Sequence, residues 1–147
     1  MTSVQAFISG LGYPAPATVE KFHKRGILVG SIAGKKKHAV NALEAGVDFI
    51  IAQGGEAGGH TGSVATTVLV PQVVDAVAGR VPVVAAGGIF DGRGLAAALS
   101  MGAAGVWIGT RFLMTPEAHI TQQALSPVRR EANRLLRRSH SRWPCGR

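Results

Sequence analysis

Residues 81–113, VPVVAAGGIFDGRGLAAALSMGAAGVWIGTRFL, decide the fold of this chain. The run Val81–Ala86 is continuously apolar, which is typical of a strand buried on both faces of a parallel sheet. Two glycines follow it, and the spacing then predicts a helix over Asp91–Met101 with Asp91 as its N-cap. A second apolar run, Gly105–Gly109, comes next. The stretch therefore predicts a β-α-β unit.

The same alternation extends toward the N-terminus. The further predicted strands are Val4–Ser9, Ile27–Gly30 and Val47–Ala52, and the further predicted helices are Ala15–Arg25, Lys35–Ala45 and Thr66–Ala78. This order fits either a doubly wound sheet or part of a (β/α)8 barrel. Glycine-rich loops after nearly every strand, and the lack of a G-x-G-x-x-G fingerprint after the first, favour the barrel. A whole barrel takes about 250 residues, so five strands are expected to form only part of one.

Composition excludes several classes of protein. The 147 residues are 46% hydrophobic, which excludes a disordered chain. No apolar run is long enough to cross a membrane, and the N-terminus lacks the pattern of a signal peptide. The single cysteine, Cys145, excludes an internal disulfide framework. We therefore expect a cytoplasmic protein without a membrane partner.

The net charge of +8 comes mainly from the end of the chain. Residues 1–124 hold 9 basic and 7 acidic side chains, whereas residues 125–147 hold 7 arginines and one glutamate. We divide the chain into a barrel-like part at 1–125 and a basic tail at 126–147. The tail lacks a sustained apolar stripe and is expected to be disordered or aberrant. Binding of nucleic acid through its arginines is a possible but disfavoured function.

One candidate site is the loop QGGEAGGHTG at 53–62, which directly follows a predicted strand. Its five glycines allow positive φ angles and close approach of the backbone to a planar ligand. A neutral imidazole at His60 is suited to act as a general base. The alternative is a flexible loop whose histidine only caps a backbone group. Glu56 either orients His60 or faces water, and we favour water.

A second candidate site combines two strand exits. Gly87 and Gly88 precede a helix, and their backbone N–H groups are suited to an anion. Gly109 and Thr110 follow the next strand, 21 residues after Gly88. In many barrels the loops after the last two strands hold a phosphate together. The alternative for each loop alone is a tight turn that needs glycine for steric reasons. The scattered histidines show no metal-binding spacing, so no metal site is expected.

At these residues the sequence resembles the nitronate monooxygenase family. The resemblance is carried by AQGGEAGGHTG at 52–62, LVPQVVDAV at 69–77, the opening stretch at 81–113 and TPEA at 115–118. It implies a TIM-barrel flavoprotein that binds FMN, with the five strands corresponding to the fourth to eighth of the barrel. It further implies that His60 is the catalytic base or substrate-orienting group, and that Gln53 lies beside the flavin. The implied phosphate contacts are Gly87, Gly88, Gly109 and Thr110.

The resemblance also implies a reaction, in which an alkyl nitronate and oxygen give a carbonyl compound and nitrite. The same barrel group includes FMN-dependent enoyl-(acyl-carrier-protein) reductases, which are the alternative. We find no counterpart of the family's first three strands, and Ser126–Arg147 does not resemble its usual ending. A truncated form is therefore expected, and a non-catalytic barrel remnant is a further alternative. Such a remnant would expose sheet edges and is expected to associate with itself or with a partner.

Overall fold

The computed structural model describes residues 4–119 and 126, and the chain divides into two compact units, Met1–Gly109 and Thr110–Arg147. The first unit alternates strands and helices in the order β1 (Ala6–Ser9), α1 (Pro16–His23), β2 (Leu28–Ala33), α2 (Lys36–Glu44), β3 (Phe49–Gln53), α3 (Thr66–Val77), β4 (Val83–Ala86), α4 (Gly92–Ser100) and β5 (Gly105–Trp107). The described part of the second unit contains α5 (Thr110–Leu113) and a 3-10 helix at Pro116–Ala118. The predicted order of elements is confirmed in the first unit. The predicted division at residue 125 stays a prediction.

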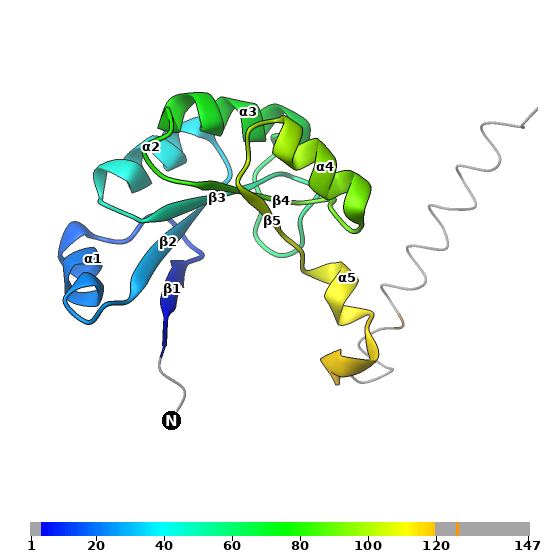
Figure 1. Cartoon of the computed structure of the whole chain (residues 1–147), viewed down its shortest axis with the longest axis horizontal. Helices are drawn as coiled ribbons and strands as arrows, with labels where there is room; N and C mark the ends of the chain where they lie inside the picture. The colour runs from blue at the N-terminus through cyan, green and yellow to red at the C-terminus, as the bar shows by residue number, and fades with distance from the viewer. Residues whose placement is uncertain (1–3, 120–125, 127–147) are drawn as a thin grey trace, which may run out of the picture. The chain divides into compact units, whose positions relative to one another are not determined.

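The first unit is built on one parallel sheet whose five strands lie in sequence order. Each strand pairs with the next one in the chain, and the connecting helices follow one another along a single face of the curved sheet (Figure 1). This is the arrangement of consecutive βα units in a barrel, where helices form the outer ring. A doubly wound sheet would place helices on both faces.

Local sequence signals set the ends of the helices. Asp91 caps α4, because its Oδ1 accepts hydrogen bonds from Arg93 N at 3.0 Å and Gly94 N at 3.4 Å. Gly46 and Gly102 follow the ends of α2 and α4 with φ angles of +89° and +88°. Glycine adopts this left-handed conformation without steric cost, so it stops a helix and redirects the chain into the next strand.

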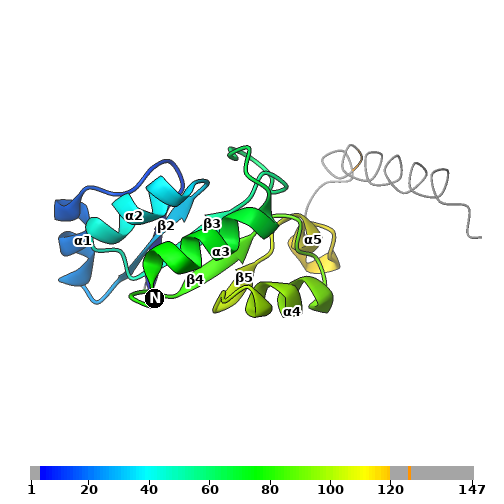
Figure 2. The same ribbon diagram turned by 90° about the horizontal axis from the view of Figure 1, so that it is seen from above.

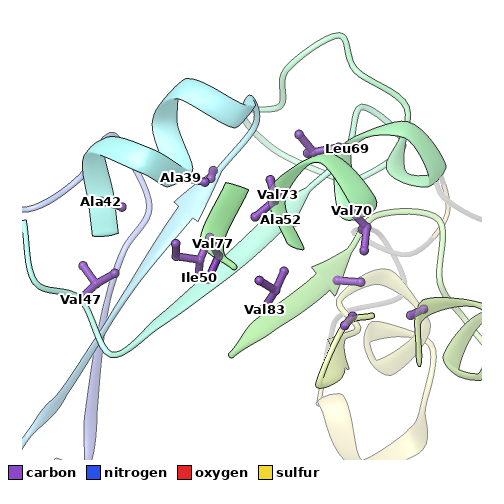
Figure 3. Close-up of a cluster of buried hydrophobic side chains, with 14 of the residues drawn as sticks. Ala39, Ala42, Val47, Ile50, Ala52, Leu69, Val70, Val73, Val77 and Val83 are labelled. Carbon is purple, nitrogen blue, oxygen red and sulfur yellow. The ribbon is translucent and has the colours of Figure 1, made fainter. Parts of the chain in front are cut away.

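The hydrophobic core lies between the sheet and its helices. Side chains from α2 and α3 pack onto β3 and β4, and they are nearly all fully buried (Figure 3). The labelled members are Ala39, Ala42, Val47, Ile50, Ala52, Leu69, Val70, Val73, Val77 and Val83. Because alternate residues of a strand point to opposite faces, Val29, Ile50 and Val83 face the helices while their neighbours face away.

The other face of the sheet has no helix over it in the first unit (Figure 1). Leu28 and Trp107 alternate with core-facing neighbours on β2 and β5 and are 53% and 43% exposed. This face corresponds to the interior of a closed barrel.

The predicted basic tail at 126–147, including Cys145, lies outside the described residues except for Ser126. Among the helices that the structure describes, none is both long enough and apolar enough to cross a bilayer.

Candidate functional site

The candidate residues of the first unit gather at the carboxyl edge of the sheet. Gln53 ends β3, Gly87 follows β4, and Gly109 lies just after β5. The strands are in register there, since Gln53 pairs with Ala86 and Ala86 pairs with Trp107. Three successive strands therefore end level with one another. This is the edge at which open and closed α/β folds bind ligands.

The loop between β3 and α3 is held by its own hydrogen bonds. Gln53 Nε2 donates to the carbonyl oxygens of Gly58 at 3.4 Å and His60 at 3.2 Å. Gly55 N donates to Val64 O at 2.8 Å and so closes the base of the loop. In Figure 2 this loop projects beyond the ends of β3 and α3. The amide nitrogen of Gln53, a predicted flavin neighbour, is thus used to shape the loop.

Two glycines of this loop, Gly54 and Gly62, are required by the protein's own packing, whereas Gly58 and Gly59 have open space where a side chain would lie. Within 53–62 only Gly59 has a positive φ, of +77°. A Cβ on Gly54 would lie 2.6 Å from Thr66 Cα, and one on Gly62 would lie 2.8 Å from Gly34 O. Such contacts are shorter than real Cβ atoms make. Glycine at 54 and 62 therefore lets the loop pack against α3 and against the turn after β2.

His60 lies in the exposed part of the loop. Its backbone carbonyl is fixed by Gln53, but its ring has no hydrogen-bond partner among the described residues. The ring is therefore accessible to a ligand at this edge.

Glu56 is exposed, as expected, but its carboxylate also contacts Thr66, which the sequence did not indicate. Thr66 N donates to Glu56 Oε2 at 2.9 Å and to Oε1 at 3.1 Å, and Thr66 Oγ1 lies 2.8 Å from Oε2. Slight desolvation raises the pKa of the Glu56 carboxyl, but hydrogen bonds from the Thr66 side chain and from the backbone of Glu56 and Thr66 outweigh it and hold the pKa below its usual value. The carboxylate caps the positive N-terminus of α3.

The turn Gly87–Gly88 has the conformation that its glycines permit. Their φ angles are +111° and +69°. In the part of the chain that the structure describes, the N–H groups of Gly87, Gly88 and Gly109 have no hydrogen-bond acceptor. Gly109 also has open space where a side chain would lie. Neighbouring strand exits therefore present free backbone donors, and their predicted contact with a phosphate stays a prediction.

Thr110 is the first residue of α5 and belongs to the second unit, so its predicted phosphate contact stays a prediction.

Sequence reasoning missed Thr66, which is 5% exposed and lies within hydrogen-bonding distance of both Glu56 and Gly87 O, the latter at 3.1 Å. It also missed Asp48, whose Oδ2 accepts from Val29 N at 2.7 Å and lies 2.8 Å from His23 Nε2. Asp48 lies at the amino end of β3, so this contact supports the fold and not the site.

The parallel sheet with its helices on one face defines a barrel-type α/β protein, and the free donors at its carboxyl edge mark a candidate ligand site. A sequence model described as nitronate monooxygenase matches residues 1–136. The chain belongs to the nitronate monooxygenase family.

Three curated relatives are similar over about three-quarters of the chain. A proposed monooxygenase of Mycobacterium tuberculosis is 56% identical, covering 78% of this chain and 30% of the relative. The (3aS,4S,5R,7aS)-5-hydroxy-7a-methyl-1-oxo-octahydro-1H-indene-4-carboxyl-CoA dehydrogenase of Rhodococcus jostii is 54% identical, covering 73% and 30%. A probable nitronate monooxygenase of Staphylococcus saprophyticus is 43% identical, covering 76% and 34%.

Two solved structures are similar to this chain over a comparable share of its length. A FabK mutant from Thermotoga maritima superposes with a TM-score of 0.76 at 39% identity, covering 80% of this chain and 39% of that one. Nitroalkane oxidase from Streptomyces ansochromogenes gives a TM-score of 0.73 at 36% identity, covering 78% and 35%. These likenesses confirm the predicted fold class, an α/β chain that forms part of a TIM barrel. The chain spans about a third of the length of the relatives that it matches.

Proposed function

We propose that this chain carries the phosphate-binding and substrate-facing edge of an FMN-dependent oxidoreductase. The observation that carries the proposal is the set of free N–H groups on Gly87, Gly88 and Gly109, at the exits of two paired strands. Backbone donors without side chains suit the phosphate of FMN, because they approach its oxygens closely and bring no competing charge. Thr110 would add a hydroxyl to the same group, and Gln53 would lie beside the ring system.

His60 is proposed to handle the substrate. Its ring is exposed, and the bond from Gln53 to its carbonyl fixes the backbone that carries it. A nitronate is a small anion, and an imidazole can donate a hydrogen bond to its oxygens or exchange a proton with it. The flavin, when bound, accepts electrons from the substrate and passes them to oxygen. The protein residues supply position and hydrogen bonds.

A second candidate substrate is a coenzyme A or acyl-carrier thioester. It is favoured by one observation: the relative named as a carboxyl-CoA dehydrogenase is 54% identical to this chain, against 43% for the one named as a nitronate monooxygenase. The likeness to FabK fits the reductase alternative. In such an enzyme the flavin would exchange hydride with a nicotinamide cofactor.

Flavin binding and flavin reduction test these proposals on the purified chain. We expect FMN to bind, with quenching of its fluorescence. Anaerobic addition of ethyl nitronate should then bleach the visible absorbance of bound FMN, whereas NADH or NADPH should not. Bleaching only by a nicotinamide cofactor would favour the thioester alternative, and absence of FMN binding would overturn both.

A matched pair of variants tests the role of His60. His60→Ala should slow bleaching by the nitronate and leave FMN affinity close to that of the wild type. The control is His38→Ala, which alters an exposed histidine in the first turn of α2. An equal effect of both substitutions would contradict the role of His60.

A further inference from the structure

A buried hydroxyl links the histidine loop to the glycine turn. Thr66 is the first residue of α3 and one of two buried polar residues among those that the structure describes, the other being Ser31. Its Oγ1 lies 2.8 Å from Glu56 Oε2, in the loop, and 3.1 Å from Gly87 O, in the turn after β4. One side chain thus contacts two segments that lie more than 20 residues apart in sequence.

Glu56 completes the connection. Both of its carboxylate oxygens lie within 3.1 Å of Thr66 N, so the loop is tied to the backbone of α3 as well as to the hydroxyl. Hydrogen bonds to a charged acceptor are about twice as strong as neutral ones. The carboxylate therefore holds the middle of the loop against the start of the helix.

The loop and the turn pack closely against each other at Gly87 and Gly88. A Cβ on Gly87 would lie 2.7 Å from Thr66 Oγ1 and 3.2 Å from Gly54 O. One on Gly88 would lie 3.3 Å from the Cβ of Glu56. Gly54 N in turn donates to Ala86 O at 2.9 Å. The loop and the turn are thus in contact on both sides of the Thr66 hydroxyl.

We propose that Glu56 and Thr66 are positioning residues, which form a clasp that fixes the histidine loop and the Gly87–Gly88 turn as one unit. The clasp sets where the free N–H groups of the turn lie relative to His60. Its role toward FMN rests on the function proposed above, but the mechanical link between loop and turn does not. Neither residue needs to touch a ligand to act in this way.

The test is a set of substitutions at one position. Thr66→Val keeps the branched shape and removes the hydroxyl, whereas Thr66→Ser keeps the hydroxyl and removes a methyl group. Thr67→Val is the matched control, because Thr67 is the exposed next residue of α3. Glu56→Ala removes the other half of the clasp.

Amide hydrogen exchange measures the clasp without any ligand. Thr66→Val should speed exchange at the Gly54, Gly55 and Ala57 amides by roughly tenfold, the effect of losing one hydrogen bond to a charged group. Glu56→Ala should speed it at least as much, because it also removes the bonds from Thr66 N. Exchange in β2 should not change. In the double variant the combined effect should be less than the sum of the two single effects, because both substitutions remove the contact between the Thr66 hydroxyl and the Glu56 carboxylate. Equal acceleration in β2, or none in the loop, would overturn the clasp.

FMN affinity measures the consequence for the site. Thr66→Val should weaken FMN binding roughly tenfold, and Thr66→Ser should restore it. Unchanged affinity in Thr66→Val, with a loosened loop, would overturn the link to the turn. If the wild-type chain binds no FMN, the proposed function fails, and the clasp is judged by the exchange data alone.

Discussion

Replacing Gly87 by alanine tests the geometry of the turn after β4. The residue has a φ of +111°, a conformation that side chains disfavour. Its added Cβ would lie 2.7 Å from the Oγ1 of Thr66, and Thr66 is 5% exposed and engaged with Glu56. The Thr66 Oγ1 cannot move away from this Cβ without losing its contacts with Glu56 and Gly87 O.

The magnitude follows from these two effects. Holding a non-glycine residue in a sparsely populated backbone region costs about 1–3 kcal/mol. The steric contact adds to this cost, so we expect Gly87→Ala to lower the free energy of unfolding by about 2–3 kcal/mol. That is a large fraction of the roughly 5–15 kcal/mol that stabilises a typical domain.

Urea unfolding followed by circular dichroism measures the change, with FMN titration in parallel. Gly92→Ala is the matched control, because Gly92 begins α4 with an ordinary φ and with open space where a Cβ would lie. It should be neutral or slightly stabilising. If Gly87→Ala unfolds at the same urea concentration as the wild type, the left-handed turn and its contact with Thr66 are wrong.

Three further predictions concern separate parts of the first unit. Asp91→Ala should lower the free energy of unfolding by about 1 kcal/mol, the usual value of an N-cap, and unfolding in urea would show no change if the cap were dispensable. Val73→Ala should lower the free energy of unfolding by about 1–3 kcal/mol, because it leaves a cavity in the core. Val68→Ala is the control and should leave the free energy of unfolding unchanged, because Val68 is half-exposed. Because the pKa of Glu56 lies below its usual value of 4.5, its stabilisation is present above pH 4.5 and is lost as the pH falls through the lowered value. Exchange in the loop should therefore accelerate at acidic pH relative to β2, and Glu56→Gln should weaken this pH dependence.

The order of strands and helices followed from sequence because each element carries its own signal. Continuous apolar runs identified the five strands, and glycines after the helices marked where they stop. Element ends were less predictable. The predicted end of β2 at Gly30 was wrong, because Ser31 interrupts the apolar run that marked the strand. The strand continues to Ala33. The Ser31 side chain is nevertheless buried, and its Oγ lies 3.5 Å from Gly12 O.

The candidate site was only partly predictable. Strand pairing brings Gly87 and Gly109 to one edge, and this followed from their positions after consecutive strands. The contact between Glu56 and Thr66 did not, since it closes a glycine-rich loop that has no periodic pattern. The glycines at 54 and 62 suggested space for a ligand, but they make room for the protein's own backbone. Composition alone does not distinguish these two uses of glycine.

Comparing FMN with riboflavin on the purified chain tests the central claim most directly, since the two flavins differ only in the phosphate. If the N–H groups of Gly87, Gly88 and Gly109 hold that phosphate, FMN should bind at least about tenfold more tightly than riboflavin, as expected for hydrogen bonds to a charged group. Equal affinity for both flavins, or no binding of either, would contradict the account.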